Sequence, residues 1–247
     1  MALCRPRPGR PLSGTVAAPL LVLWDIDQTL IEVGGATQQA YAAAFHRATG
    51  RTLEAQWRFN GRTELAAATH VLRAHGIVPT PAQVDAFIAL VVEELHARAE
   101  QMRTDGRVLP GAAAALDAGH ALPGARQSVL TGNLYPLAVL KLSVFELASY
   151  LDLRLGAFGG DAHDRTDLPA HAWRRAEREV GHRFTGADTV IVGDTLLDVA
   201  TGRAAGARVV AVATGPASAA DLRAAGADVV LTDLRDTDAV IDAIAPR

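Results

Sequence analysis

LLVLW at residues 20–24 runs directly into DIDQTL at residues 25–30, and this stretch decides the fold of the chain. An uninterrupted apolar run of this kind is typical of a strand buried on both faces of a parallel sheet. The run ends in two aspartates, Asp25 and Asp27. Open α/β sheets bind their ligands at the carboxyl ends of their strands. The stretch therefore predicts a central strand and a polar site at its end.

Similar short apolar runs recur farther along the chain, and helical patterns separate them. Further strands are expected at residues 127–130, 189–192, 209–212 and 229–231. Helical patterns lie, for example, at residues 136–147, 169–180 and 198–205. This alternation predicts an α/β fold with an open, Rossmann-like parallel sheet and helices on both of its faces.

The segment between residues 34 and 106 lacks such strand runs and contains mainly helical patterns. These patterns lie at residues 37–48, 63–75 and 81–103. We interpret the segment as a helical insertion after the first strand, with glycine-containing joints at residues 34–35 and 105–106. The predicted organisation is a disordered leader at residues 1–18, an α/β core at residues 19–33 and 107–247, and the helical insertion at residues 34–106.

Composition and charge exclude several classes of partner. The 24 basic and 27 acidic residues give a net charge of −3, so no excess of positive charge is available to bind a nucleic acid backbone. Cys4 is the only cysteine, which rules out a disulfide framework and a cysteine-based zinc site. The leader contains no apolar stretch that fits a signal peptide or a membrane span. We expect a cytoplasmic monomer or homodimer, with no nucleic acid or membrane partner.

Acidic residues gather where the predicted strands end. Asp25 and Asp27 follow the first strand, Asp194 follows a later one, and Asp198 falls in the first turn of the next helix. Thr131, at the end of a third strand, adds a hydroxyl group and neighbouring backbone N–H groups. Crowded carboxylates at a buried strand end are costly unless a cation or a proton transfer compensates them. Oxygen ligands of this kind favour Mg²⁺ over zinc, so we predict a magnesium site.

The chain resembles the haloacid dehalogenase-like hydrolase superfamily, and most closely its phosphoglycolate-phosphatase-like branch. The matching motifs are DIDQTL at residues 25–30, TGN at residues 131–133 and GDTLLD at residues 193–198. Each motif alone is weakly specific, but their order, spacing and position at strand ends together identify the family. The resemblance covers the core from residue 20 to about residue 215.

The resemblance implies a role for each matching residue. Asp25 would be the nucleophile that forms an aspartyl-phosphate, and Asp27 would be the general acid for the leaving group and then the general base for water. Thr131, with Gly132 and Asn133, would bind the phosphoryl group. A carboxylate can attack a phosphate dianion only when a cation offsets the repulsion between them.

The resemblance also implies the metal ligands of the site. Asp25, the Asp27 carbonyl and Asp194 would hold Mg²⁺, and Asp198 would support the metal. The cofactor expected for this chain is therefore Mg²⁺.

Two positions depart from the family pattern. The position after Asp27 is usually glycine and here is Gln28, a change from which we expect little effect on the chemistry. The third motif usually contains a lysine, but Lys141 is the only lysine of the chain and lies elsewhere. Arg165 stands within about two positions of the expected lysine and could replace it with a permanent, forked charge; the alternative is a solvated loop arginine. Lys141, on a predicted helix, should lie on the order of 10 Å from the strand end, so we favour Arg165.

The resemblance implies that the helical insertion at residues 34–106 is the cap domain of the family. Within it, the expected cap loop, NGRTE at residues 60–64, resembles the loop that points into the active site in phosphoglycolate-phosphatase-like proteins. Arg62, and with less support Arg58, are then candidate substrate contacts, although Arg62 is also compatible with a solvated surface position.

The function that we predict is a Mg²⁺-dependent phosphatase acting on a small phosphorylated metabolite, such as a sugar phosphate or phosphoglycolate. A phosphomutase of the same fold and a non-catalytic regulatory protein on a phosphatase scaffold remain alternatives. Asp27 argues against a dehalogenase, whose halide leaving group needs no proton.

Overall fold

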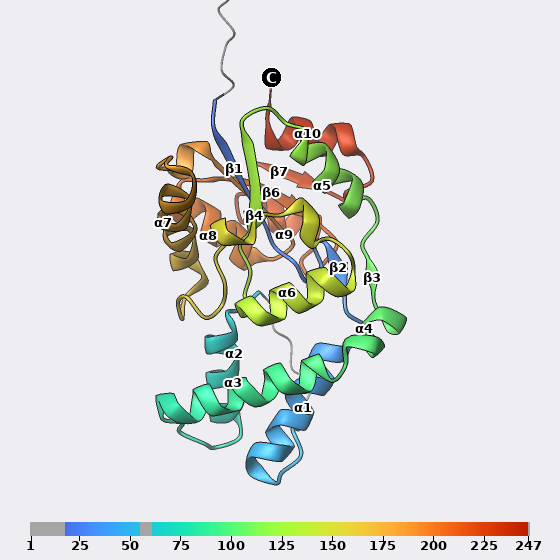
Figure 1. Cartoon of the computed structure of the whole chain (residues 1–247), viewed down its shortest axis with the longest axis vertical. Helices are drawn as coiled ribbons and strands as arrows, with labels where there is room; N and C mark the ends of the chain where they lie inside the picture. Colours follow the sequence, from blue (N-terminus) through green and yellow to red (C-terminus); the bar gives the residue numbers. More distant parts are fainter. Residues whose placement is uncertain (1–17, 55–60, 247) are drawn as a thin grey trace, which may run out of the picture.

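The computed structural model describes residues 18–54 and 61–246 and contains a five-stranded parallel sheet (Figure 1). The strands stand in the order β4-β1-β5-β6-β7. Their bounds are Leu20–Trp24 for β1, Ala125–Val129 for β4, Thr189–Gly193 for β5, Arg208–Val212 for β6 and Val229–Leu231 for β7. The predicted fold class is confirmed, and the first apolar run is an interior strand of the sheet.

Helices cover both faces of the sheet, and the alternation of side chains along β1 shows how. Val22 and Trp24 belong to the larger hydrophobic core, which includes residues of α5, α6 and α10. Leu21 and Leu23 point to the opposite face and pack with α7. On that same side of the fold, a smaller cluster joins α8 and α9 to β6. The bounds are Ala112–His120 for α5, Tyr135–Val144 for α6, Leu168–Val180 for α7, Leu196–Ala205 for α8, Ala219–Ala224 for α9 and Thr237–Ile244 for α10.

A helical insertion follows β1, as the sequence predicts. It is joined to the core by two short antiparallel strands, β2 (Ile31–Glu32) and β3 (Arg107–Val108). Its helices are α1 (Ala36–Thr49), α2 (Glu64–Ala74), α3 (Pro81–His96) and α4 (Ala99–Asp105). The helical pattern at residues 81–103 is divided between α3 and α4, with the break at Ala97 and Arg98. We call α1 to α4 the cap.

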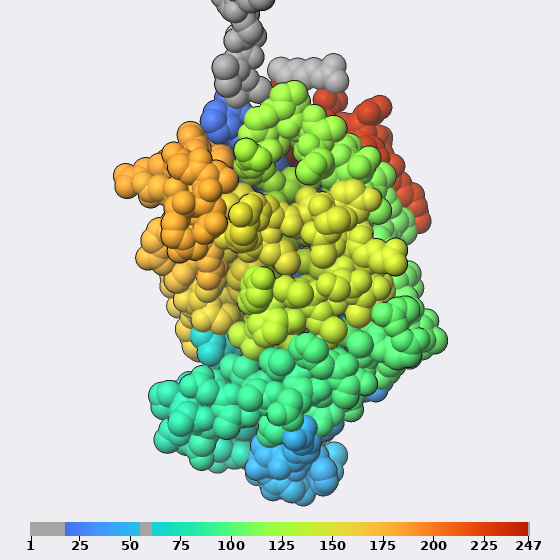
Figure 2. Space-filling model, viewed as in Figure 1, coloured from blue at the N-terminus to red at the C-terminus, as the bar shows by residue number. Residues whose placement is uncertain are grey.

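The cap has its own hydrophobic core. Tyr41 and Phe45 of α1 pack with Phe87 of α3, and the ring centroids of Phe45 and Phe87 are 6.4 Å apart. Where the cap meets the core domain, α3 and α4 contact α6, and Figure 2 shows the cap lying directly against this part of the core.

The two connections between cap and core lie side by side. Gly34 has a φ of 59°, and a Cβ atom at this position would lie 2.6 Å from the backbone carbonyl carbon of Asp105. Only glycine combines this left-handed conformation with so close an approach. The limits that we predict for the leader, core and cap remain predictions, and the leader lies outside the described residues except for Ala18.

Three-residue 3₁₀ helices occur in the loops of the core. They are η1 (Ala148–Tyr150), η2 (Leu153–Leu155), η3 (Arg165–Asp167) and η4 (Gly186–Asp188). Of these, η3 carries one of the residues that the sequence singles out, Arg165, at its first position.

Candidate active site

The carboxyl ends of three neighbouring strands bring the candidate residues together. Asp25 follows β1, Thr131 lies just beyond β4, and Asp194 follows β5. The backbone N–H of Asp25 donates to the Val192 carbonyl at 2.8 Å, which extends the pairing of β1 and β5 to the site itself. All three side chains are buried. The strands therefore fix the positions of these groups, as expected for an open parallel sheet.

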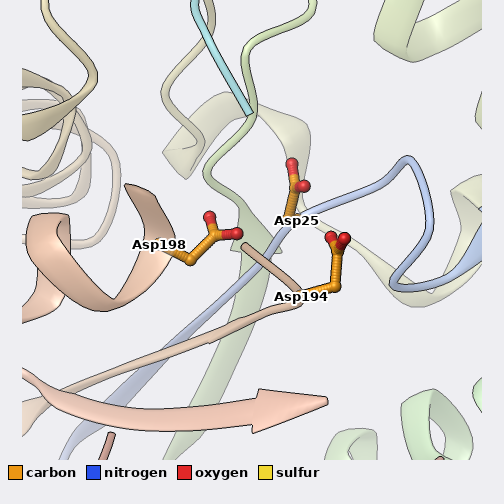
Figure 3. A group of neighbouring side chains, drawn as sticks. All are labelled: Asp25, Asp194 and Asp198. Carbon is orange, nitrogen blue, oxygen red and sulfur yellow. The ribbon is translucent and has the colours of Figure 1, made fainter. Parts of the chain in front are cut away.

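Three carboxylates form a compact, buried cluster (Figure 3). Asp25, Asp194 and Asp198 each offer an oxygen within 4.8 Å of the others. Burial raises the pKa of Asp25 to about 6; Arg165 opposes this shift, while Asp198 and Asp27 add to it. Burial also raises the pKa of Asp194 well above its usual range, with further contributions from Asp198 and Asp25. The cluster carries more negative charge than its protein surroundings compensate.

The hydrogen bonds of the cluster distinguish Asp194 from Asp198. Oδ1 of Asp194 accepts from the Thr29 hydroxyl at 3.1 Å, whereas its Oδ2 is buried without a hydrogen-bond partner among the described residues. Both oxygens of Asp198 are engaged. Its Oδ2 accepts from the backbone N–H and the hydroxyl of Thr195, at 3.0 and 2.6 Å, in the capping box that begins α8, and its Oδ1 accepts from Arg165. Asp194 therefore has a buried oxygen without a hydrogen-bond partner among the described residues, whereas both oxygens of Asp198 accept hydrogen bonds from the protein.

Arg165 contacts two of the three carboxylates of this cluster. Its Nη2 is 3.0 Å from Oδ1 of Asp25 and 2.5 Å from Oδ1 of Asp198, and its side chain is only 2% exposed. The same nitrogen donates to the Leu130 carbonyl at 3.1 Å. The structure thus places the guanidinium group of Arg165 against the carboxylates of both Asp25 and Asp198.

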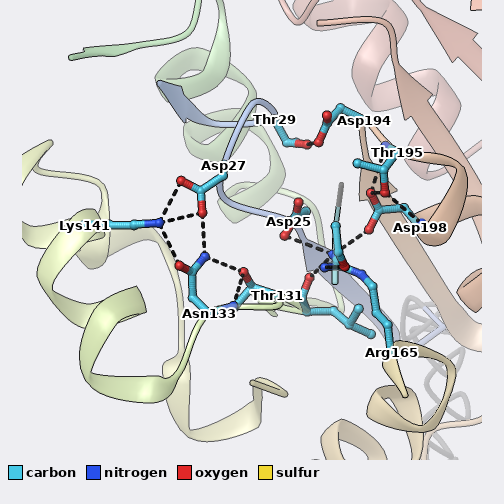
Figure 4. Close-up of polar contacts among 12 residues, drawn as sticks. Asp25, Asp27, Thr29, Thr131, Asn133, Lys141, Arg165, Asp194, Thr195 and Asp198 are labelled. Atoms are coloured by element: carbon cyan, nitrogen blue, oxygen red, sulfur yellow. Dashed lines mark hydrogen bonds and ion pairs between the residues drawn. The ribbon is translucent and has the colours of Figure 1, made fainter. Parts of the chain in front are cut away.

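Lys141 also reaches the site but contacts a different carboxylate (Figure 4). Its Nζ donates to both oxygens of Asp27, at 2.8 and 2.7 Å, and to Oδ1 of Asn133 at 2.7 Å. The expectation that Lys141 lies remote from the site is wrong. Helical side chains lean toward the helix N-terminus, so the long side chain of Lys141 extends back along α6 toward the strand end.

Within the TGN motif, Thr131 is hydrogen-bonded to Asn133, the residue that also contacts Lys141. The Thr131 hydroxyl oxygen accepts from the backbone N–H of Asn133 at 3.3 Å and from its Nδ2 at 2.8 Å. No described residue accepts the proton of that hydroxyl, so it is available to a ligand. Gly132 allows the cap loop to come close, because a Cβ atom there would lie 2.1 Å from the Arg62 carbonyl oxygen.

A pocket of about 450 Å³ lies between the core and the cap. The candidate residues that line it are Asp25, Asp27, Arg62, Thr131, Gly132, Asn133, Arg165 and Asp194; Lys141 and Glu64 line it as well. Asp198 is fully buried behind the pocket wall. Gln28, which replaces the usual glycine, also lines the pocket and has a φ of 64°. This left-handed conformation is the physical reason why glycine is favoured at the position.

The cap loop is hydrogen-bonded to the core in this structure. The backbone N–H of Glu64 donates to the Gly132 carbonyl at 2.8 Å, and the Thr63 hydroxyl donates to the His163 carbonyl at 2.6 Å. Arg62 is exposed at the rim of the pocket, and Arg58 lies outside the described residues. The cap is therefore closed over the site.

Two charged groups of the pocket were not predicted to lie there: Lys141, and the side chain of Glu64, although Glu64 belongs to the expected cap loop. Glu64 is buried, accepts from the Tyr41 hydroxyl at 3.0 Å, and has its pKa raised to about 7 by burial, a shift that Lys141 opposes. A signal for Lys141 was present, because it shares an apolar helical face with Leu137 and Ala138 at spacings of four and three residues. A lysine on such a face requires an acidic partner.

Comparison with known proteins identifies the family. A family model described as haloacid dehalogenase-like hydrolase matches residues 22–203. The chain belongs to this family of hydrolases and phosphatases, as its motifs predict. No curated protein sequence matches the chain.

Solved structures with the same fold cover nearly the whole chain. A predicted phosphatase from Clostridium acetobutylicum is 18% identical, with a TM-score of 0.69 over 92% of this chain and 100% of that one. A hydrolase from Pseudomonas syringae is 20% identical, with a TM-score of 0.70 over 92% of this chain and 99% of that one. A predicted phosphoglycolate phosphatase from Haemophilus somnus 129pt is 17% identical, with a TM-score of 0.65 over 92% and 99%. The α/β core with its helical cap is thus shared with these proteins.

None of the helices in the described part of the chain is long and apolar enough to cross a membrane.

Proposed function

We propose that this protein is a Mg²⁺-dependent phosphatase that hydrolyses a small phosphate monoester through an aspartyl-phosphate on Asp25. The observation that carries the proposal is the buried cluster of Asp25, Asp194 and Asp198, in which an Asp194 oxygen has no hydrogen-bond partner among the described residues. Buried carboxylates without compensation are strongly destabilising, so their convergence is best explained by a bound cation. A Mg²⁺ ion satisfies this requirement with the oxygen ligands that it prefers.

The donor set of the site fits Mg²⁺. Asp25 and Asp194 would hold the ion together with the main-chain carbonyl of Asp27, while Asp198 would act mainly by fixing Arg165. When bound, Mg²⁺ neutralises the negative charge that accumulates between the attacking carboxylate and the phosphoryl group.

The residues of the chain provide the remaining chemistry. An oxygen of Asp25 attacks phosphorus while the bond to the leaving oxygen breaks, and Asp27 gives its proton to the departing alcohol. Asp27 then takes a proton from a water molecule, whose oxygen attacks the aspartyl-phosphate. Inorganic phosphate leaves, and both carboxyl groups return to their starting states.

Positioning of the phosphoryl group falls to the TGN motif and to Arg165. The free O–H of Thr131 and the backbone N–H groups near Gly132 would donate to phosphoryl oxygens, and Arg165 would keep Asp25 oriented. The closed cap leaves a pocket of about 450 Å³, which favours a small substrate. We further propose that the protein is a cytoplasmic monomer or homodimer and that its substrate is a small phosphorylated metabolite.

The proposal is tested by turnover of p-nitrophenyl phosphate with Mg²⁺, with a chelator, and by the Asp25→Asn variant. We expect phosphate release only with Mg²⁺ and none from Asp25→Asn, since an amide cannot attack phosphorus. Asp117→Asn on α5, an exposed position outside the site, is the matched control and should be fully active.

Three results would contradict the proposal. They are inactivity on every ester of a panel, equal activity with and without metal, or retention of activity by a folded Asp25→Asn protein. Conversion of a sugar phosphate into its isomer without phosphate release would instead establish the phosphomutase alternative.

A further inference from the structure

The chain contains a single lysine, and that lysine is buried against the proposed general acid. The side chain of Lys141 is 1% exposed, and its Nζ lies within hydrogen-bond distance of both Asp27 oxygens, at 2.8 and 2.7 Å. The side chain of Asp27 is 35% exposed and faces the pocket. One partner of this pair is therefore fixed in the helix packing, while the other is open to a ligand.

Asn133 completes a closed set of contacts around Asp27. Its Nδ2 donates to Oδ2 of Asp27 at 2.7 Å, and its Oδ1 accepts from Lys141 at 2.7 Å. The same Nδ2 lies 2.8 Å from the Thr131 hydroxyl, which is proposed to hold the phosphoryl group. Figure 4 shows the Asp27 carboxylate directed toward Lys141 and Asn133. Through Asn133, the orientation of the Asp27 carboxylate is thus coupled to Thr131, the proposed binding residue of the phosphoryl group.

Stability alone gives little reason for a lysine at this position. The face of α6 that buries Lys141 also buries Leu137, Ala138 and Leu142, and an apolar residue would pack there without the cost of desolvating a charge. Replacement of a buried ion pair by apolar residues of similar volume is often neutral or stabilising. The cation therefore needs an explanation beyond the packing of the helix.

We infer that Lys141 is a positioning residue, which with Asn133 holds the acid/base Asp27 in register with the phosphoryl site. This inference rests on the proposed function. The sequence presents Arg165 and Lys141 as alternative candidates for the cation of the third motif. With this inference the two residues have different partners: Arg165 contacts the nucleophile Asp25, and Lys141 contacts Asp27. Each carboxylate of the first motif thus has its own buried cation, supplied by a different element.

The contact can be tested without any activity, because a single lysine gives a single side-chain signal. In protein labelled at lysine Nζ and Cε, we expect the Lys141 NMR signals to shift or broaden in Asp27→Asn. Asp161→Asn is the matched control, since Asp161 pairs with Arg175 outside the pocket, and it should leave the signals in place. Identical lysine spectra in wild type and Asp27→Asn would overturn the inference.

The positioning role itself is tested with Lys141→Met on two esters. General acid catalysis is worth about 10²-fold or more, and only poor leaving groups need it. We expect kcat on an alkyl phosphate to fall by about 10²-fold, with less than about fivefold change on p-nitrophenyl phosphate and with KM nearly unchanged. In the Asp27→Asn background, Lys141→Met should have no further effect, because the group that it positions is absent.

The controls distinguish failure of this inference from failure of the proposed function. Arg175→Met removes another partly buried cation and should affect neither ester. An equal loss on both esters, or a full effect of Lys141→Met in Asp27→Asn, would overturn the positioning role. Inactivity of the wild type on both esters would overturn the proposed phosphatase instead. If Lys141→Met does not fold, Lys141→Arg is used instead, and we expect a smaller loss of kcat with the same difference between the two esters. The NMR comparison does not depend on either variant, because it requires no substitution at residue 141.

Discussion

The guanidinium group of Arg165 joins the proposed nucleophile to the cap. Its Nη2 lies 3.0 Å from Oδ1 of Asp25, and its Nη1 donates to the carbonyl of Gly61 in the cap loop at 2.8 Å. A lysine has one nitrogen on a flexible stem and could not make both contacts in this fixed geometry. Arg165 therefore links the cap loop to the position of Asp25.

This relationship predicts different losses for two substitutions of Arg165. Arg165→Lys keeps the charge but loses the contact with Gly61, and we expect kcat to fall by about 10-fold. Arg165→Met removes the charge from Asp25 and Asp198 as well, and kcat should fall by about 10²-fold or more. Steady-state kinetics on p-nitrophenyl phosphate measure both, with the exposed Arg154→Lys as control. An active Arg165→Met enzyme would show that Arg165 does not carry the third motif.

A second prediction concerns Gly215, which lies against the proposed metal ligand Asp194. A Cβ atom at this position would lie 1.7 Å from Oδ2 of Asp194, so Gly215→Ala must displace that carboxylate. Disturbing the surroundings of a metal ligand typically costs 10- to 100-fold in affinity, and we expect a rise of about 10-fold in the Mg²⁺ concentration for half-maximal activity. The increase in melting temperature on adding Mg²⁺ should shrink in parallel.

The control for this experiment is Gly160→Ala. Its Cβ atom would meet only the end of the Leu134 side chain, at 3.0 Å, which can rotate away. Unchanged Mg²⁺ dependence in Gly215→Ala would argue against Asp194 as a ligand.

A third prediction follows from the buried carboxyl group of Glu64. Burial raises its pKa from 4.5 to about 7, so the folded state retains a proton that the unfolded state releases between these values. The contribution of this group to the free energy of unfolding is present below the unfolded pKa and is lost as the pH rises through the folded pKa. Glu64→Gln does not titrate and keeps an acceptor for Tyr41. As the pH rises from about 5 to about 8, the free energy of unfolding of Glu64→Gln should therefore increase relative to that of the wild type. The increase should be about 3 kcal/mol at most.

Urea unfolding at the two pH values measures this difference. Glu93→Gln, at a side chain that is 61% exposed, should show no comparable change. A stability difference between Glu64→Gln and wild type that is the same at both pH values would show that Glu64 is not protonated in the folded protein.

The sequence predicts the sheet and the convergence of the acidic residues because both depend on local patterns. The apolar runs determine which segments are strands, and the rule that ligands bind at strand ends brings Asp25, Thr131 and Asp194 together. The boundary of β4 was harder to predict. It contains Gln127 and Ser128, whose buried polar groups are satisfied by Leu116, Trp24 and Asp152, partners that a local pattern does not show.

The direction in which a long side chain extends could not be predicted from the sequence. The position of Lys141 in the chain suggested a distant group, because a rise per residue measures the backbone and not the direction of a long side chain. Glu64 belongs to the expected cap loop, but the burial of its side chain could not be predicted from a local pattern. Its burial arises only when the cap loop packs on Gly132 of the core, a contact between segments about 70 residues apart in sequence.

The last prediction concerns the substrate and depends on Arg62. This residue lies on the cap loop beside Gly132 and is exposed at the pocket rim. In the described part of the chain, it forms no hydrogen bond or ion pair with a catalytic carboxylate. It is therefore placed to contact the part of a substrate that extends from the phosphoryl group.

For the preferred small phosphate ester found by screening, Arg62→Ala should raise KM by about 10-fold and leave kcat almost unchanged, because the lost contact is the same in the ground state and the transition state. An aryl phosphate that makes no cap contact should be hydrolysed normally. Arg73→Ala, at an exposed position on α2 that does not line the pocket around Asp25, is the matched control and should alter neither constant. If Arg62→Ala lowers kcat on both esters, Arg62 acts on the chemistry or on cap closure and does not select the substrate. Efficient hydrolysis of a phosphoprotein or an oligonucleotide end, with weak activity on all small esters, would show that the cap opens widely and that the substrate is not a small metabolite.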